Sequence, residues 1–398
     1  MLTNRRLSVA VLGLAVAACA LLPVPALAAS KPNVTVPSAL LMTMDGRVLW
    51  SRQPDTERRV ASTIKMLNAL VVREHANLDD TVIVSAKAAK TADGVGLVKG
   101  QRLTVRQLLQ MMLVASANDA AEAIAIHIGG TEANYVKLMN AKAKSLGLAH
   151  THTRDPHGLG KKEHSTARDL SVLARTVMAD PVLRKIVLMK KVSVPRPHKK
   201  PVSVDSTDQL LGHYAGIEGV KTGFTNPAGY CFVGAAKRGR IELLSVVLGA
   251  KTLKARFSES RKLLNWGFDG FKVKTVVSAT ATMGVVRVRD GVAASDPVHA
   301  SRDATALVWT HQPVTTSITL PVEVSAPVHR GDQLGVVRAV QGTKTLAAVA
   351  LLAGADVARA APSPSSQVSS AGVARTFLQR LWAAVSAGLA WGRVAGSS

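Results

Sequence analysis

Cysteine and acidic residues are scarce in this sequence. Two of the 398 residues are cysteines, Cys19 and Cys231, and 26 Asp and Glu residues are outnumbered by 50 Lys and Arg, for a formal net charge of +24. If the N-terminal segment with Cys19 is cleaved off, one thiol remains and no internal disulfide can form. We therefore expect a fold held by packing alone, with Cys231 as a small buried residue of a strand.

Long apolar runs are also missing after residue 28, where no stretch of 18 uncharged apolar residues occurs. Membrane-spanning helices are thus not expected there. Residues 1–28 differ, because two arginines, an apolar run and Ala26-Leu27-Ala28 follow one another in the layout of a secretory signal peptide. Val16-Ala17-Ala18-Cys19 is also similar to a lipoprotein signal, so lipidation of Cys19 stays open. Export of the chain is expected in either case.

The excess of positive charge is compatible with two kinds of partner. A strongly basic chain commonly binds nucleic acid. An exported chain meets anionic lipids and wall polymers instead. We therefore expect no nucleic-acid partner.

Residues 29–271 contain the signals of an α+β domain. Residues 38–51 predict a β-hairpin that turns at Asp45-Gly46. Three strand-like runs between residues 220 and 250 are joined by short turns and predict an antiparallel meander. Segregated layers of helices and strands follow from this order. Helices are expected at residues 60–71, 104–128 (in two parts, separated by the polar residues Ser116–Asp119), 131–147, 166–179 and 252–266.

The C-terminal third has three different characters. Residues 272–352 alternate apolar and polar side chains, are rich in Val and Thr, and predict a small all-β domain. Residues 353–372 read as a flexible Ser/Pro/Ala linker. Residues 373–394 predict an amphipathic helix with Trp and Arg at the boundary of its apolar face, suited to lying on an anionic membrane surface. The alternative is a helix that packs back onto the protein.

Three short motifs carry the chemistry: Ser62-Thr-Ile-Lys65, Ser116-Ala-Asn118 and Lys221-Thr222-Gly223. Each occurs once, and each alone is a weak signal. The first lies at a helix start, the second in a break between helices and the third on a strand that leads into a hairpin. That order and those settings together make the signal strong.

A serine hydroxyl needs a base to become a nucleophile. Lys65 can be that base only when it is neutral, and both burial and the nearby cation Lys221 would lower its pKa. Ser116 can relay the proton to a leaving amine, and Asn118 can hold the substrate amide and Lys65 in register. For Ser116–Asn118 the alternative is a helix N-cap.

The three motifs resemble the active site of the penicillin-recognising serine acyltransferases. Further phrases, such as "DPHGL", "HSTARDLSVLA", "VKTGFTNPAGYC" and "KARFSESRKLLNWGF", are similar to D-alanyl-D-alanine carboxypeptidases over nearly the whole mature chain. The resemblance implies a β-lactamase/transpeptidase-like catalytic domain within the α+β class, an extracytoplasmic location and peripheral attachment to the membrane. The substrate it implies is a peptidoglycan stem peptide ending in D-Ala-D-Ala, and β-lactams are the implied inhibitors.

The resemblance also implies a role for each matching residue. Ser62 is the implied nucleophile and Lys65 the implied general base. The backbone N–H groups of Ser62 and Phe224 are the implied oxyanion donors, although Phe224 stands where a small polar residue or His is common. Arg256 matches an arginine near the substrate carboxylate. The implied second-motif and strand-motif residues are Ser116, Asn118, Lys221, Thr222 and Gly223.

Three other functions are alternatives to that of a D-alanyl-D-alanine carboxypeptidase. A β-lactamase of the best-known class would carry an E-x-x-x-N stretch, which is absent between Ser116 and Lys221. A D,D-endopeptidase that cleaves cross-links would use the same motifs. A wall-binding protein with a relic site fits poorly with intact Ser62, Lys65 and Lys221.

Four histidines between residues 150 and 164 invite a metal interpretation. No second cluster of carboxylates or cysteines at ligand spacing accompanies them. The family that the sequence resembles uses neither metal nor cofactor. We therefore predict none, and we expect this segment to be a polar loop.

Overall fold

The computed structural model describes residues 31–361. The predicted signal peptide and amphipathic helix, and most of the predicted linker, lie outside these residues. The described chain divides into two compact units, and the division passes between Lys274 and Thr275. Residues Leu307–Pro313 belong with the first unit. Within the described residues, no helix has the length and apolarity needed to cross a membrane.

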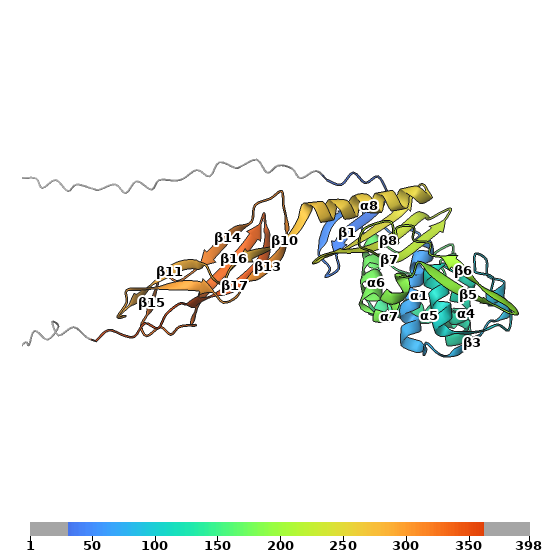
Figure 1. The fold of residues 1–398 in the computed structure, drawn as a ribbon, viewed down its shortest axis with the longest axis horizontal. Helices are drawn as coiled ribbons and strands as arrows, with labels where there is room; N and C mark the ends of the chain where they lie inside the picture. The colour runs from blue at the N-terminus through green and yellow to red at the C-terminus, as the bar shows by residue number, and fades with distance from the viewer. Residues whose placement is uncertain (1–30, 362–398) are drawn as a thin grey trace, which may run out of the picture. The chain divides into compact units, whose positions relative to one another are not determined.

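The first unit is built on a five-stranded antiparallel sheet with the strand order β2-β1-β9-β8-β7 (Figure 1). The predicted hairpin is confirmed as β1 (Ser38–Thr43) and β2 (Val48–Arg52). The predicted meander is confirmed as β7 (Ile217–Thr225), β8 (Gly229–Arg238) and β9 (Ile241–Ala250). Pairing of β1 with β9 joins the two parts, which leaves β7 as an edge strand. An edge strand offers unpaired main-chain groups to a ligand.

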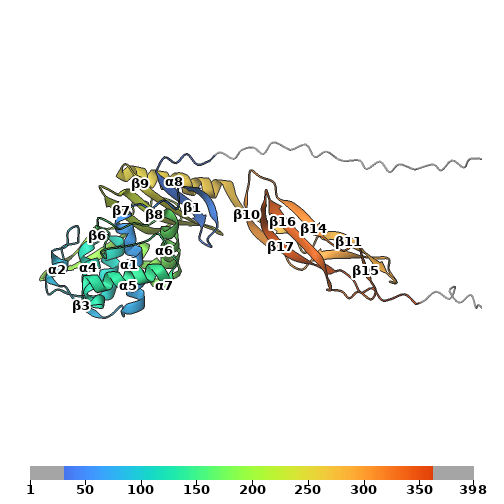
Figure 2. The same cartoon turned by 180° about the vertical axis from the view of Figure 1, so that it is seen from behind.

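Helices cover both faces of this sheet. Helix α8 lies along one face, and η1, α1 and α6 lie toward the other (Figures 1 and 2). The helices predicted between residues 60 and 266 are all present. The helices of the unit are η1 (Ala61–Ile64), α1 (Lys65–His75), α2 (Ala86–Ala89), α3 (Val105–Val114), α4 (Asn118–Gly129), α5 (Glu132–Ser145), α6 (Ala167–Ala179), α7 (Pro181–Val187) and α8 (Leu253–Gly270).

The alternation of side chains along the strands divides the core in two. On β1, Leu40 and Met42 belong to the core on the α1 side, whereas Ala39 and Leu41 belong to the core under α8. Every residue of β1 is buried, because helices cover both faces of the sheet. Cys231 on β8 is buried and free, as predicted.

Two short strand pairs complete the first unit. β3 (Thr81–Ile83) pairs with β4 (Arg102–Thr104), and β5 (Lys191–Arg196) pairs with β6 (Lys199–Asp205). Most helices start at a capping side chain. Thr104 forms a capping box with Gln107, and Thr131, Thr166 and Thr252 cap α5, α6 and α8.

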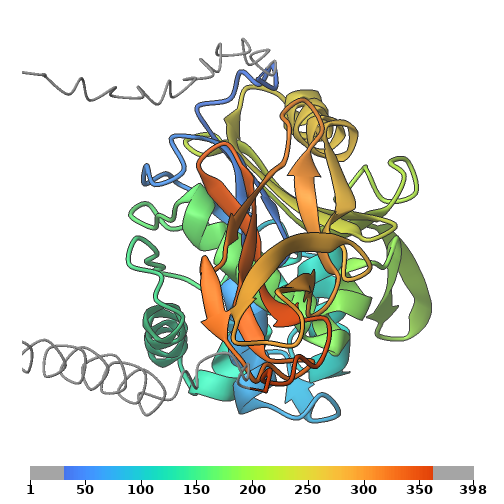
Figure 3. The ribbon, with the colours of Figure 1, turned by 90° about the vertical axis from the view of Figure 1, so that its left-hand side faces the viewer.

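The second unit is all-β, as predicted, and its strands are coloured orange to red in Figure 3. Its main sheet has the order β14-β16-β17-β12-β11-β15, and β10 and β13 form a separate two-stranded sheet. The strands are β10 (Phe271–Val277), β11 (Thr282–Arg289), β12 (Ser295–Ala300), β13 (Ala304–Trp309), β14 (Thr315–Thr319), β15 (Glu323–Ser325), β16 (Gln333–Gln341) and β17 (Lys344–Ala353).

The start of the predicted linker needs correction. Residue 353 ends β17, and Val357 is 2% exposed and exchanges two backbone hydrogen bonds with Val328. Arg359 also forms a bridge with Gly291. Composition alone suggested that this stretch buries nothing, but Val357 packs into a small apolar cluster with Val286 and Val288.

Candidate active site

The first motif places a hydroxyl and an amine side by side. Ser62 is the second residue of the 3₁₀ turn η1, and Lys65 is the first residue of α1. Lys65 Nζ lies 2.7 Å from Ser62 Oγ. Lys65 is fully buried, as expected from its position on the apolar side of the helix.

Lys65 Nζ has two further contacts, at 2.6 Å with Asn118 Oδ1 and at 2.9 Å with the main-chain O of His157. Both of these oxygens can only accept a hydrogen bond. A neutral amine has two N–H groups and one lone pair, so the two oxygens take the N–H groups and the lone pair is left for the Ser62 hydroxyl. The arrangement thus suits transfer of the serine proton to lysine.

Burial lowers the pKa of Lys65 to about 7, while the carboxylates of Asp155, Glu163, Asp93 and Asp119 act to raise it. We expected the charge of Lys221 to lower the pKa of Lys65. In the structure the charge of Lys65 instead lowers the pKa of Lys221. The pKa of Lys221 is lowered by burial and then by the charges of Lys65 and Arg256. A lysine with a pKa near neutrality is matched to general-base work.

The second motif lies at the N-terminal end of α4 and completes this cluster. Ser116 has a left-handed backbone, with φ of +60°, and α4 begins at Asn118. The residue in the N-cap position is Ala117, which makes no capping bond, so the N-cap alternative for Ser116–Asn118 is wrong. Instead Asn118 contacts Lys65, and its Nδ2 donates to the main-chain O of Ala92. Strained backbone of this kind is common at active sites.

The third motif lies on the edge strand β7. Lys221 Nζ donates to Ser116 Oγ at 2.8 Å and to the main-chain O of Thr222 at 2.9 Å. Lys221 is 1% exposed. Thr222 Oγ1 donates to Thr207 Oγ1 at 2.6 Å, which ties β7 to residues 206–208. All three motifs therefore meet around one pair of lysines.

Two glycines allow the backbone to approach Ser62 closely. A Cβ added at Gly223 would lie 2.7 Å from the main-chain O of Val60 and 3.2 Å from the Ser62 N. A Cβ added at Gly158, where φ is +98°, would lie 2.8 Å from the Ser62 N. Glycine is required at both positions because no side chain fits there.

The loop that carries Gly158 contains functional groups that sequence reasoning did not assign. The main-chain O of His157 accepts from Lys65 Nζ and lies 3.3 Å from Ser62 Oγ. Asp155 holds this turn, because its Oδ1 accepts from the N–H groups of His157 and Gly158. A main-chain acceptor leaves no side-chain signal, although the phrase "DPHGL" marks its place.

Arg256 lies close behind β7. It is 6% exposed, and its Nη1 donates to the main-chain O of Gly223 at 3.2 Å. Burial raises the pKa of the nearby Asp208 to about 6, against the opposing effects of the Leu210 N–H and the charges of Arg256 and Lys221. Asp208 was not singled out in the sequence, and it adds a carboxyl group between two cations of the site.

Phe224 is the exposed member of the group. Its side chain is 44% exposed and stacks on Tyr230, with the ring centroids 4.1 Å apart. It extends the edge of β7 beside the motif Lys221-Thr222-Gly223. Its aromatic ring therefore forms part of the rim.

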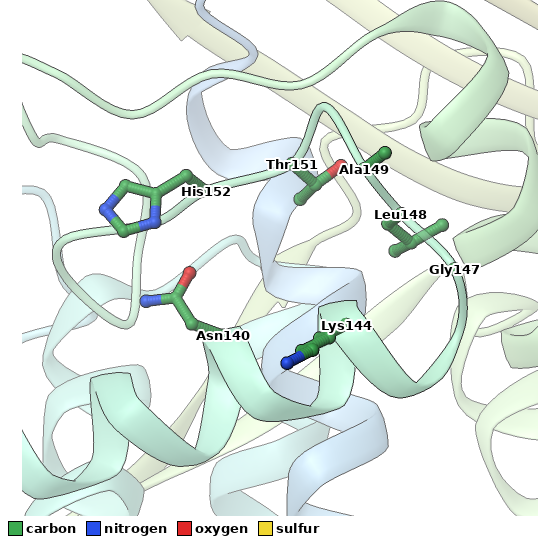
Figure 4. Close-up of a pocket in the computed structure, with 7 residues that line it drawn as sticks. All are labelled: Asn140, Lys144, Gly147, Leu148, Ala149, Thr151 and His152. Atoms are coloured by element: carbon green, nitrogen blue, oxygen red, sulfur yellow. The ribbon is translucent and has the colours of Figure 1, made fainter.

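The four histidines between residues 150 and 164 do not form one cluster. His150 pairs with Glu57 at the surface, and the rings of His152 and His164 lie 6.0 Å apart. His152 lines a pocket between α5 and residues 147–152, where Figure 4 shows it near Asn140. Only His157 of the four turns inward, and its side chain is 11% exposed.

Comparison with known proteins agrees with this geometry. A family model described as D-alanyl-D-alanine carboxypeptidase (peptidase S11) matches residues 26–252, which include all three motifs. The D-alanyl-D-alanine carboxypeptidase DacF of Bacillus subtilis is 29% identical over 334 residues, 81% of this chain and 86% of its own. DacC of Escherichia coli is 30% identical over 324 residues, 77% of this chain and 80% of its own.

Comparison of the fold with solved structures identifies the same family. The structure of penicillin binding protein 5 from Haemophilus influenzae matches with a TM-score of 0.63 at 28% identity, over 83% of this chain and 99% of that one. An α+β unit followed by a β-rich unit is thus shared with that protein. The chain belongs to the D-alanyl-D-alanine carboxypeptidases of peptidase family S11, the serine-type penicillin-binding enzymes that act on peptidoglycan.

Proposed function

We propose that this chain removes the terminal D-Ala from peptidoglycan stem pentapeptides through an acyl-enzyme on Ser62. The observation that carries the proposal is the contact of Lys65 Nζ with Ser62 Oγ inside a buried set of acceptors. A buried lysine of lowered pKa beside a serine is an activated nucleophile.

In the acylation step, Ser62 Oγ attacks the carbonyl carbon of the penultimate D-Ala, and its proton passes to Lys65 Nζ. The oxygen of that carbonyl gains negative charge. The main-chain N–H groups of Ser62 and Phe224 are our candidates for its donors, and one such donor contributes about 10²–10³ in rate. The Gly223 approach to Ser62 N supports this assignment, because it brings β7 against the start of η1.

The C–N bond then breaks, and the leaving D-Ala amine needs a proton. The proton that Lys65 took from Ser62 is the one to be delivered, and its delivery returns Lys65 to the neutral form. Ser116 Oγ, which Lys221 Nζ holds by a hydrogen bond, is our candidate to relay this proton to the amine. Asn118 holds Lys65 beside the second motif during this transfer.

Hydrolysis of the acyl-enzyme follows the same path in reverse. A water takes the place of the leaving amine, neutral Lys65 accepts its proton, and the ester bond breaks as Ser62 Oγ takes that proton from Lys65. A β-lactam carbonyl would acylate Ser62 in the same way. Because its leaving amine stays tethered to the acyl group, water has less room to approach.

Substrate selection rests on positive charge beside β7. The substrate ends in a free carboxylate, which a cation and hydroxyl donors recognise. Lys221 and Thr222 lie next to each other on β7, and Arg256 adds charge from behind Gly223. A D,D-endopeptidase with the same motifs remains the second candidate, and the exposed Phe224 at the rim is the feature that would contact the larger cross-linked substrate.

For the chain as a whole we propose the following organisation. Residues 1–28 are a signal peptide, 29–271 the catalytic domain and 272–359 a small all-β domain. The linker starts after Arg359 and extends to residue 372, and residues 373–394 hold the protein on the outer face of the cytoplasmic membrane. Deletion of residues 373–398 is expected to release the protein from membranes, and unchanged partitioning would contradict this anchor.

The central test uses purified protein, a fluorescent penicillin and a stem pentapeptide. We expect one label per chain and release of D-Ala, and loss of both in Ser62→Ala. Ser145→Ala, at an exposed serine of α5, is the matched control and should behave as wild type. Equal labelling of Ser62→Ala would refute the mechanism. Labelling without D-Ala release, together with cleavage of a cross-linked dimer, would favour the endopeptidase.

A further inference from the structure

Behind the catalytic loop, three side chains from separate elements converge. Glu122 of α4, Glu132 of α5 and His157 each present one ligand atom, and these atoms lie within 4.8 Å of one another. Glu122 is 1% exposed, and its carboxylate pairs with the ammonium group of Lys87, 3.0 Å from Oε1. A carboxylate buried in this way needs a cation beside it.

The orientation of His157 gives a second, independent argument. Its Nδ1 lies 2.9 Å from Asp155 Oδ1, so Nδ1 is the nitrogen that carries the proton. The lone pair of Nε2 then points toward Glu122 Oε2, 3.8 Å away. Two acceptors that face each other repel unless a cation lies between them. A carboxylate behind the imidazole of a metal ligand is the usual arrangement at zinc sites.

Lys87 supplies the positive charge in the structure described here. Its Nζ lies 3.0 Å from Glu122 Oε1 and also contacts Glu132. The Lys87 side chain is 58% exposed, whereas the two carboxylates are 1% and 25% exposed. One flexible lysine thus balances two carboxylates and can swing out to solvent when another cation arrives.

We propose that Glu122, Glu132 and His157 bind a divalent transition-metal ion in place of the Lys87 ammonium group. The imidazole nitrogen favours zinc or a similar metal over magnesium or calcium. Three atoms no more than 4.8 Å apart lie at most about 2.8 Å from their centre, so bonds of ~2.0–2.2 Å need inward shifts of roughly 0.6 Å. Glu132, partly exposed at the start of α5, has the freedom to make them.

The proposed metal site and the catalytic contacts share one residue, His157. The ring of His157 would bind the metal, while its main-chain O accepts from Lys65 Nζ and lies 3.3 Å from Ser62 Oγ. A metal on the ring would fix the peptide that aligns the catalytic pair. The inference does not depend on which substrate the enzyme cleaves.

The test is binding of Zn²⁺ to the full mature protein, produced without a polyhistidine tag and freed of metal by a chelator. We expect one equivalent per chain by calorimetry, a raised thermal midpoint, and a Co²⁺ absorption spectrum of low coordination number. Glu132→Gln should weaken binding by about 10-fold or more, as loss of even an outer partner does. Lys87→Met removes the competing cation and should tighten binding several-fold.

Two controls keep the result specific. Glu74→Gln changes an exposed carboxylate of α1 that pairs with Lys142, and it should leave Zn²⁺ affinity unchanged. His152→Asn removes a surface histidine and should also have no effect. Zn²⁺ binding that survives Glu132→Gln and disappears in His152→Asn would overturn the proposal, as would absence of binding in both wild type and Lys87→Met. If Glu132→Gln does not fold, Glu122→Gln replaces it.

Discussion

The two units of the chain differ in how they bury charge. In the first unit, Lys65, Lys221, Glu122, Glu163 and Asp208 are each at most 6% exposed. Among the described residues of the second unit, Asp296 is the one buried charged side chain, and both its oxygens accept main-chain N–H groups, from Gly354 and Ala355. The first unit contains charges whose partners are incomplete, and the second unit contains a charge that closes a turn.

The two units differ in why they bury charged side chains and in how much stability this burial costs. Buried polar atoms without hydrogen bonds occur at Glu163, Asp208 and Arg256, all in the first unit. Each such group costs about 1–3 kcal/mol of stability. In return, burial sets the pKa of Lys65 and keeps a base close to Ser62. Function, rather than stability, accounts for charge buried in this way.

The largest effect is expected when the base is replaced by a permanent cation. Lys65→Arg keeps positive charge but cannot accept a proton, because arginine stays charged at any working pH. Penicillin acylation should fall by about 10²–10⁴-fold. Stopped-flow acylation measures this, with the exposed Lys191→Arg of β5 as the matched control. Near-normal acylation by Lys65→Arg would show that the buried lysine is not the base.

The next effect is the pH dependence of acylation by chelator-treated protein. Burial lowers the pKa of Lys65 to about 7, so its amine is neutral above that pH and protonated below it. The acylation rate should be flat above about pH 7 and fall about 10-fold per pH unit below it, as expected for a single proton. An acylation rate that rises on acidification would contradict the assignment of Lys65 as the general base. Unchanged near-UV circular dichroism over the same pH range is the control that the protein stays folded.

The exposed rim should matter less than the buried cluster. Phe224→His keeps the main-chain N–H of residue 224 and changes only the ring that stacks on Tyr230. We expect a change of less than about 10-fold in acylation, since one lost donor would give about 10²–10³. Acylation kinetics with two penicillins of different side chain provide the measurement. A drop of 10²-fold or more would mean that the ring, and not the main chain, does the essential work.

In the second unit, the expected effect is on stability and not on catalysis. Asp296→Ala leaves the main-chain N–H of Ala355 unpaired, whereas that of Gly354 keeps the main-chain O of Pro297, and the loss should cost roughly 1–3 kcal/mol. Urea unfolding followed by circular dichroism reports this loss, while penicillin acylation at 25 °C stays unchanged. Glu323→Ala, at an exposed residue paired with Arg289, should stay within about 0.5 kcal/mol of wild type. A loss of acylation in Asp296→Ala would break the distinction between the units.

The sequence alone determined the elements and the three motifs. Periodicity located the helices, the hairpin at Asp45-Gly46 and the meander, because these depend on residues close in the chain. It also predicted that Lys65 lies on a buried helix face, which the structure has. The residue types of the motifs were enough to indicate a serine acyl-transfer reaction.

Tertiary structure alone decided which groups meet. Lys221 reaches Ser116 across 105 residues, and Lys65 reaches the His157 carbonyl across 92. The spacing of the four histidines showed no carboxylate cluster beside them, but folding brings Glu122 and Glu132 to His157. No local pattern encodes such contacts, since they arise only when α4, α5 and the 155–158 turn pack together around the buried amine.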